Sequence, residues 1–241
     1  MARSLRHMIT GPEACHYLPD AAMTTESRVM IDVSPEELEE LLELGWRRFG
    51  PVYFRPVCTG CTECVSVRVP AAQFTPSPNM KRVMQRAKGL RIEVARPTVD
   101  DARLELHARW HTSREGSRGW ASSDLDRESY ALQFCFPHPS AREYSYWSGD
   151  ELVAIGITDQ TPRALSAVYC YYAPEHRELS PGTLNVLVAL EHAKAQALSH
   201  VYLGYRVEAC PSLHYKGRFT PQERLRGRLE PGETSRWEPF E

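Results

Sequence analysis

Three closely spaced cysteines constrain this chain more than any other feature of its sequence. They are Cys58, Cys61 and Cys64, with two residues between successive members. That spacing lets the thiolates converge on one centre, and thiolates suit zinc or an iron–sulfur cluster. Both kinds of site usually take four ligands, and Cys15 is the best candidate for the fourth. The alternative is a metal-free loop of reduced thiols packed on a neighbouring helix.

The rest of the sequence indicates a compartment in which such thiols stay reduced. The first residues lack the apolar core and cleavage site of a secretory signal, and no apolar run approaches the roughly 18 residues that span a bilayer. We therefore expect a cytoplasmic protein without a membrane segment, whose cysteines form no disulfides. The cysteines without a partner spacing are expected to be buried thiols: Cys135, Cys170 and Cys210.

The patterns of apolar residues predict an α+β fold. They indicate helices over 34–45, 100–114, 126–134 and 182–197, and strands over 52–54, 65–69, 91–95, 143–147, 152–158, 165–172 and 200–205. Ser34 and Glu37 make a capping box at the first helix. A meander followed by a crossover helix and another strand predicts a mixed sheet. We place a boundary near residue 97, between an N-terminal subdomain of residues 1–97 with the cysteine cluster and a domain of residues 98–241.

Basic residues gather around the cysteine cluster in the sequence. With 29 Lys and Arg against 31 Asp and Glu, the whole chain is unlike a protein that coats nucleic acid, but this balance allows a local basic patch. The candidates for binding an anion are Arg47, Arg48, Arg68, Lys81 and Arg82. Guanidinium groups bind both carboxylates and phosphates, so the anion is either an acidic side chain or an RNA backbone. The alternative is an ordinary solvated surface.

Several residues of the second half are candidates for a reaction site. Asp159 ends a predicted strand and could accept a proton from an amine, although aspartate is also an ordinary turn residue. Tyr202 and Tyr205 flank Gly204 at the end of another strand, and Lys216 follows. The motifs of serine hydrolases, of P-loop NTPases and of HExxH metalloproteases are all missing from the sequence. Group transfer from an already activated donor fits this pattern better than hydrolysis.

Several segments of the chain match the motifs of one protein family, and they occur in the same order as in that family. They are residues 15–19, 45–50, 53–69, 74–77, 157–159, 165–169, 182–183, 201–205 and 215–219. The chain resembles the aminoacyl-tRNA–protein transferases, which comprise the arginyltransferases and their bacterial leucyl counterparts. The resemblance implies an acetyltransferase-like second half that uses aminoacyl-tRNA in place of acetyl-CoA, with no nucleotide cofactor. It also implies an iron–sulfur cluster on the four cysteines, as in some members.

The resemblance further implies an activity in protein turnover. Such enzymes move Leu or Arg from a charged tRNA to the N-terminal α-amine of a protein that begins with Asp or Glu, which marks that protein for degradation. On this hypothesis Asp159 or Tyr205 contacts the amine. Arg47, Arg48, Lys81 or Lys216 would recognise the acidic side chain or a tRNA phosphate.

Two other interpretations stay open at this point. The loop at residues 177–183 is spaced like the pyrophosphate loop of acetyl-CoA-dependent N-acetyltransferases, although it is poorer in glycine. The cysteines and basic residues alone would also suit a non-enzymatic, metal-containing module that binds RNA.

Overall fold

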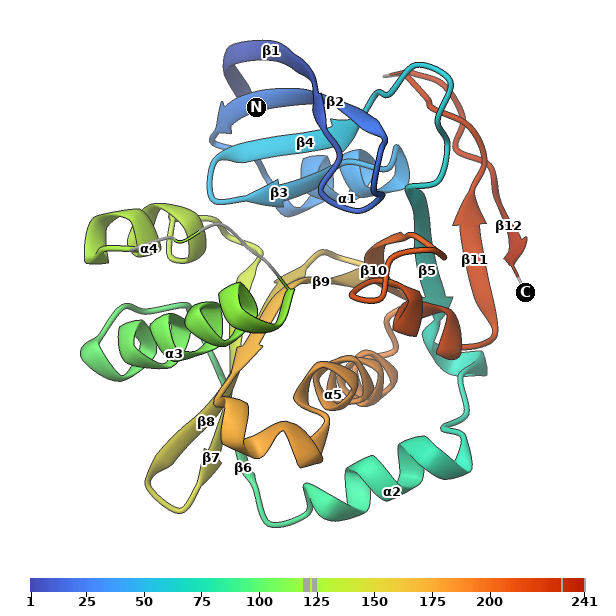
Figure 1. Ribbon diagram of the computed structural model, residues 1–241. Helices are drawn as coiled ribbons and strands as arrows, with labels where there is room; N and C mark the ends of the chain where they lie inside the picture. The colour runs from blue at the N-terminus through green and yellow to red at the C-terminus, as the bar shows by residue number, and fades with distance from the viewer. Residues whose placement is uncertain (119–121, 123–124, 231, 241) are drawn as a thin grey trace.

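Two β-sheets with helices around them form the protein (Figure 1). The computed structural model describes residues 1–118, 122, 125–230 and 232–240. In these residues a four-stranded sheet has the order β1-β2-β4-β3, and an eight-stranded sheet has the order β12-β11-β5-β10-β9-β8-β7-β6. No helix in the described part of the chain is both long enough and apolar enough to cross a bilayer.

The small sheet is built from the N-terminal residues. Its strands are β1 (Arg3–Ala14), β2 (Ala22–Ile31), β3 (Arg47–Phe49) and β4 (Val52–Pro56), and all its pairings are antiparallel. The hairpin of β1 and β2 was not predicted. Nearly every residue of β1 is exposed, so the strand lacks the alternation of apolar and polar residues that reveals a half-buried strand.

Helix α1 (Pro35–Glu43) follows the hairpin and begins where the sequence predicts. The Ser34 side chain accepts a hydrogen bond from the Glu37 amide, and the Glu37 carboxylate accepts one from the Ser34 amide at 2.9 Å. This capping box is therefore confirmed. Leu38 and Leu42 point into a core shared with Trp46 and Tyr53 of the small sheet, and this packing fixes β3 and β4 beneath the helix.

The large sheet is mixed, which confirms the predicted α+β class. Its strands are β5 (Val65–Pro70), β6 (Arg91–Ala95), β7 (Ala141–Ser148), β8 (Glu151–Gln160), β9 (Ala164–Tyr172), β10 (His200–Arg206), β11 (Gln222–Leu225) and β12 (Trp237–Phe240). Only the pairing of β9 with β10 is parallel among the described strands. Strands β5 and β6 precede residue 97, so the large sheet takes strands from both sides of the boundary that the sequence predicts.

Helices cover both faces of the large sheet. On one face α2 (Pro78–Arg86) and α5 (Pro181–Ala195) share a core with β5 and β10. On the other face α3 (Asp101–Arg118) and α4 (Arg127–Phe134) pack on β8 and β9 (Figure 1). Short helical turns at Ala71–Gln73, Pro174–Leu179 and His214–Arg218 complete the chain. Helix α5 connects β9 to its parallel neighbour β10, as the sequence predicts.

Strands β9 and β10 stay paired over a short distance only. His200, Val201 and Tyr202 pair with residues 164–166, and the pairing ends there. At the same point the register of β10 against β5 shifts between Tyr202 and Gly204, which is the mark of a β-bulge. The two strands therefore separate beyond Tyr202. The separating parts of these strands lie between the small sheet and helix α5 (Figure 1).

Candidate active site

Two cationic side chains meet at the bulge of β10, and neither has a carboxylate partner among the residues that the structure describes. Gly204 has φ +78°, and a Cβ atom placed on it would lie 3.5 Å from Lys216 Nζ and 3.6 Å from Arg47 Nε. Arg47 comes from β3 of the small sheet, and Lys216 comes from the turn at His214–Arg218. The missing side chain of Gly204 therefore leaves a cradle between an ammonium and a guanidinium, which we call the Arg47–Lys216 site.

Within the described part of the chain, the hydrogen-bond partners of these two cations are all neutral groups. Arg47 Nη1 donates to the Trp46 carbonyl at 2.9 Å, and Nη2 donates to the Ser66 hydroxyl at 2.7 Å. The residue is only 7% exposed. Its Nε is buried, and it donates to no acceptor in the described part of the protein. Lys216 Nζ donates to the Tyr205 carbonyl at 2.9 Å. An unsatisfied buried donor of this kind is uncommon in folded proteins.

Burial makes the charge of both groups unfavourable. Desolvation, followed by repulsion from Arg47, lowers the pKa of Lys216 to about 7. Desolvation likewise lowers the pKa of Arg47. An anion that entered the cradle would relieve both penalties at once. The site is therefore arranged to bind a negatively charged group.

The tyrosines predicted from β10 border this site. The Tyr205 hydroxyl donates to the Gly45 carbonyl at 2.9 Å, and burial raises its pKa above the usual range. The Arg47 guanidinium lies 5.4 Å from the ring centroid of Tyr202 and 5.7 Å from that of Tyr205. Both rings thus present their electron-rich surfaces to the cation. A contact of Tyr205 with a substrate amine stays a prediction.

Arg68, another predicted anion ligand, already has carboxylate partners. Its Nε donates to Glu223 and its Nη1 donates to Glu43, both at 2.7 Å. Nη1 also donates to the Tyr202 hydroxyl at 3.1 Å. This network neutralises the guanidinium and connects β5, β11 and α1. Arg68 therefore supports the wall of the site, and its role in binding substrate stays a prediction.

The structure places Arg48 and Asp159 against each other. Arg48 Nε donates to Asp159 Oδ2 at 2.9 Å, and Nη2 donates to Oδ1. The side chains are only 6% and 1% exposed. Both carboxylate oxygens of Asp159 are thus occupied by the guanidinium fork, an arrangement that favours a positioning role. A role of Asp159 as proton acceptor stays a prediction.

An aromatic cluster lies next to Arg47 and was not identified from the sequence. Phe49 follows Arg47 on β3, and its ring centroid lies 6.0 Å from that of Phe54 and 5.8 Å from that of Tyr169. Phe134 of α4 closes the group at 5.5 Å from Tyr169. We call these four residues the aromatic wall. Phe49, Phe54 and Tyr169 keep part of their surface accessible, which distinguishes them from a sealed core.

The four cysteines of the predicted metal site gather, but they do not form a ligand set. Desolvation, followed by the negative charges of Cys15, Cys58 and Cys61, raises the pKa of Cys64 to about 12, so the thiols lie within electrostatic range of one another. Among the described residues, however, no three His, Cys, Asp or Glu side chains are arranged to hold a metal ion. All four cysteines are unpaired thiols of intermediate burial. Zinc or an iron–sulfur cluster on these residues stays a prediction.

The cysteines expected in the core divide into two kinds. Cys210 is buried as expected, whereas Cys135 and Cys170 keep part of their surface exposed. Desolvation raises the pKa of Cys135 to about 11 and that of Cys170 to about 12, so both are protonated thiols at neutral pH.

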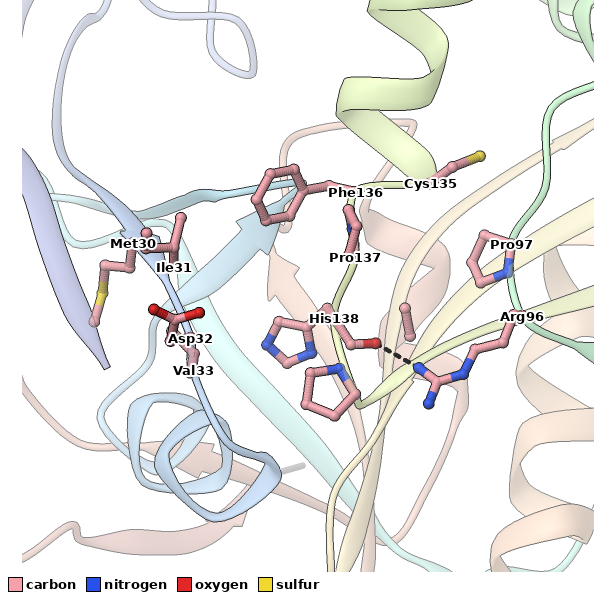
Figure 2. Close-up of a pocket in the computed structure, with 12 residues that line it drawn as sticks. Met30, Ile31, Asp32, Val33, Arg96, Pro97, Cys135, Phe136, Pro137 and His138 are labelled. Carbon is pink, nitrogen blue, oxygen red and sulfur yellow. Dashed lines mark hydrogen bonds between the residues drawn. The ribbon is translucent and has the colours of Figure 1, made fainter. Parts of the chain in front are cut away.

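A separate cavity of about 470 Å³ lies between the end of β2 and the segment that joins α4 to β7 (Figure 2). Asp32 faces it from one side. On the other side Arg96 donates to the His138 carbonyl at 2.6 Å. Burial and two nearby arginines lower the pKa of His138 to about 3, so its ring is neutral. The ring shares a hydrogen bond of 3.0 Å with the Tyr53 hydroxyl. None of the predicted site residues lines this cavity.

Two family profiles cover most of the chain. One is described as "Arginine-tRNA-protein transferase, N terminus" and matches residues 13–82, and the other is described as its C terminus and matches residues 102–226. The chain belongs to the arginine-tRNA-protein transferase family. It is therefore an aminoacyltransferase, and this assignment excludes the two alternatives that the sequence left open, the acetyl-CoA enzyme and the non-enzymatic module.

Curated relatives match over nearly the whole chain. An aspartate/glutamate leucyltransferase of Helicobacter hepaticus is 34% identical over 229 residues, which cover 95% of each chain. Another leucyltransferase of that name, from Pseudomonas fluorescens, is 34% identical and covers 92% of this chain and 94% of its own.

Solved structures match this family member less completely. The structure of L-PGS from Bacillus licheniformis is 16% identical with a TM-score of 0.45, and it covers 71% of this chain and 50% of its own. FemX is 9% identical with a TM-score of 0.44, over 69% and 59% of the two chains.

Proposed function

We propose that this transferase moves a leucyl group from Leu-tRNA to the N-terminal α-amine of proteins that begin with Asp or Glu. The single observation that carries the proposal is the Arg47–Lys216 site, in which a buried guanidinium and a partly buried ammonium have no carboxylate partner among the described residues. The relatives named aspartate/glutamate leucyltransferase support the same acceptor and donor.

The acceptor's acidic side chain would fill the cradle beside Gly204. A carboxylate there would accept hydrogen bonds from Arg47 Nε and Lys216 Nζ, the two donors that flank this position. Charge-assisted hydrogen bonds of this kind contribute about 1.5–3 kcal/mol each. An amide side chain gains much less because it brings no negative charge and places an NH₂ group against two cations. The site therefore selects Asp or Glu over Asn or Gln.

The donor's side chain would lie on the aromatic wall. Phe49, Phe54 and Tyr169 offer an apolar, partly accessible surface next to Arg47. Desolvation raises the pKa of Tyr169, and the nearby Arg114 cation opposes that shift. An apolar leucyl group gains from this surface, whereas an arginyl group would need an acidic partner. The wall therefore supports Leu as the donor.

The reaction needs no covalent intermediate on the enzyme. The nitrogen of a neutral α-amine attacks the ester carbonyl of Leu-tRNA, the new C–N bond forms, and the ester C–O bond to the terminal ribose breaks. The amine loses a proton and the ribose oxygen gains one, so the step balances. Holding the acceptor carboxylate and the leucyl side chain at neighbouring positions brings the amine and the carbonyl together, which is the main contribution the chain makes.

The opening between β9 and β10 would admit the 3′ end of the tRNA. Beyond Tyr202 strand β10 no longer pairs with β9, whereas its other edge still pairs with β5 through Gly204 and Val67, so a substrate would approach Gly204 from the β9 side. We further propose that the reaction takes place in the cytoplasm, where charged tRNA is present, and that the added leucine marks the acceptor for degradation.

A transfer assay with matched acceptors tests the proposal. Purified protein is incubated with radiolabelled Leu-tRNA or Arg-tRNA and with peptides that differ only in their first residue, Asp, Glu, Asn or Gln. We expect label from Leu-tRNA on the Asp and Glu peptides. Transfer from Arg-tRNA alone would overturn the choice of donor, and equal transfer to all four peptides would overturn the choice of acceptor.

A further inference from the structure

One stretch of this nearly neutral chain contains no acidic residue. Between Glu63 and Glu93 the sequence holds no Asp or Glu, although the chain has 31 of them in total. The same stretch carries six cations: Arg68, Lys81, Arg82, Arg86, Lys88 and Arg91. Four of these, Lys81, Arg82, Arg86 and Lys88, belong to helix α2 or directly follow it, and we call them the α2 cations.

The α2 cations face solvent without ion-pair partners. All four are exposed, while Met80 and Val83 bury the opposite side of the helix against the core that α2 shares with α5. Within the described part of the chain none of the four forms a salt bridge, and the hydrogen bond from Arg82 to Asn79 involves a neutral amide. In contrast, the exposed Arg127 and Arg226 pair with Asp101 and Glu238. The α2 cations thus keep their charges available.

Aromatic packing connects the segment before α2 to the end of the turn that carries Lys216. Phe74, which precedes α2, packs on Phe219 with ring centroids 6.1 Å apart. Phe219 directly follows the turn that carries Lys216 and the exposed Arg218. Arg218 has no ion-pair partner among the described residues. The segment that leads into α2 therefore packs on the residue that follows the Lys216 turn, and both α2 and this turn carry cations without an ion-pair partner among the described residues.

We propose that the α2 cations bind phosphates of the tRNA acceptor stem while its aminoacylated 3′ end occupies the opening beside Gly204. This inference rests on the proposed function and extends it from the reacting end of the donor to the body of the RNA. A row of exposed, unpaired cations on a helix suits a regularly charged backbone, because phosphate contacts need charge and position rather than base-specific shape.

An acidic acceptor protein is a poorer match for this surface. The acceptor's distinguishing carboxylate is accounted for by the two cations beside Gly204, Arg47 and Lys216, whereas the α2 cations are spread along an exposed helix and its C-terminal end. Their contribution should therefore appear in the affinity for the donor and should fall as salt rises. Each phosphate contact adds a slope of about 0.7–0.9 to the dependence of log affinity on log salt concentration.

The test compares two donors and two sets of variants. One variant combines Lys81→Gln, Arg82→Gln, Arg86→Gln and Lys88→Gln, which removes charge and keeps helix-forming residues. The matched control combines Arg127→Gln and Arg226→Gln. The donors are intact Leu-tRNA and 3′-leucyl-adenosine, which has the reacting ester but no stem. Thermal unfolding confirms that both variants fold.

We expect the α2 variant to raise KM for Leu-tRNA at least tenfold at 100 mM salt, with kcat and the acceptor KM changed less than twofold. The slope of log KM against log salt should fall by about 2 or more. With 3′-leucyl-adenosine the variant and the control should match the wild type within twofold.

Three results would overturn the inference. They are an unchanged KM for Leu-tRNA, an equal loss with both donors, and a loss confined to the KM of an acidic acceptor protein. A wild-type protein that transfers leucine from neither donor would instead overturn the proposed function, so the two failures are distinguishable.

Discussion

Arg48 and Asp159 join the two sheets of the protein through a buried ion pair. Arg48 lies on β3 of the small sheet and Asp159 lies near the end of β8 in the large sheet, and Arg48 Nε donates to Asp159 Oδ2 at 2.9 Å. Arg47, the residue before it, faces the Arg47–Lys216 site. The pair therefore fixes the strand that presents Arg47 to substrate.

Removing one member of this pair should destabilise the fold. Asp159→Asn leaves a buried guanidinium without its counter-charge, and such losses cost about 3–5 kcal/mol. We expect urea unfolding to show a loss of this size. Arg48→Met combined with Asp159→Leu should recover much of it, because no buried charge then stays unpaired. A normal stability of Asp159→Asn together with a large fall in kcat would instead support Asp159 as the proton acceptor.

Binding of the acceptor should weaken as the pH rises through about 7. Lys216 has a pKa lowered to about 7, so its ammonium is present below that pH and is lost above it. The KM for an Asp-initiated peptide should accordingly rise above pH 7, once the fraction of neutral acceptor amine is taken into account. In Lys216→Arg the cation persists, and the rise should disappear. An unchanged pH profile in that variant would contradict this role of Lys216.

Lys216 should also lower the stability of the fold at a pH at which its side chain is charged and able to bind the acceptor. Its pKa is lower in the folded state than in the unfolded state, so the unfolded chain binds more protons between about pH 7 and pH 10. Stability contributed by this group therefore rises with pH across that window. Lys216→Met should raise Tm most below pH 7 and less as the pH approaches 10. A constant difference in Tm across this range would show that packing alone is responsible.

The aromatic wall should control the use of the leucyl donor. Phe49→Ala removes the ring that contacts both Phe54 and Tyr169. We expect kcat/KM for Leu-tRNA to fall about tenfold or more, since a large apolar contact is lost. Leu132→Ala is the control, because Leu132 is an apolar residue that is 56% exposed and lies outside the wall. Equal effects of the two changes on leucine transfer would remove the wall from the donor site.

The strongly patterned elements were predictable from the sequence, but the contacts that build the site were not. Helix α5 and strands β8–β10 are rich in apolar residues and were predicted on that ground, and the capping box marked α1 directly. Exposed strand β1 has no such pattern. Individual Phe residues such as Phe49 look like core in the sequence, so the wall emerged only when β3, β4 and β9 came together.

The ion pair between Arg48 and Asp159 could not be predicted from the sequence either. Arg47 and Arg48 are adjacent and chemically identical, yet strand geometry sends them to opposite faces, where only Arg48 finds a carboxylate. Sequence reasoning grouped both as anion ligands. Which of them stays available depends on the position of Asp159, far along the chain.

Discrimination between Asp and Asn acceptors shows whether the Arg47–Lys216 site recognises the acceptor's carboxylate. Peptides that differ only in this first residue are assayed for kcat/KM with Leu-tRNA, using wild-type protein and the Arg47→Met variant, with Arg226→Met as the exposed control. The wild type and the control should favour Asp by at least about 100-fold, and Arg47→Met should reduce that preference about tenfold or more. An Arg47→Met protein that folds and keeps the full preference for Asp would contradict the assignment of the Arg47–Lys216 site.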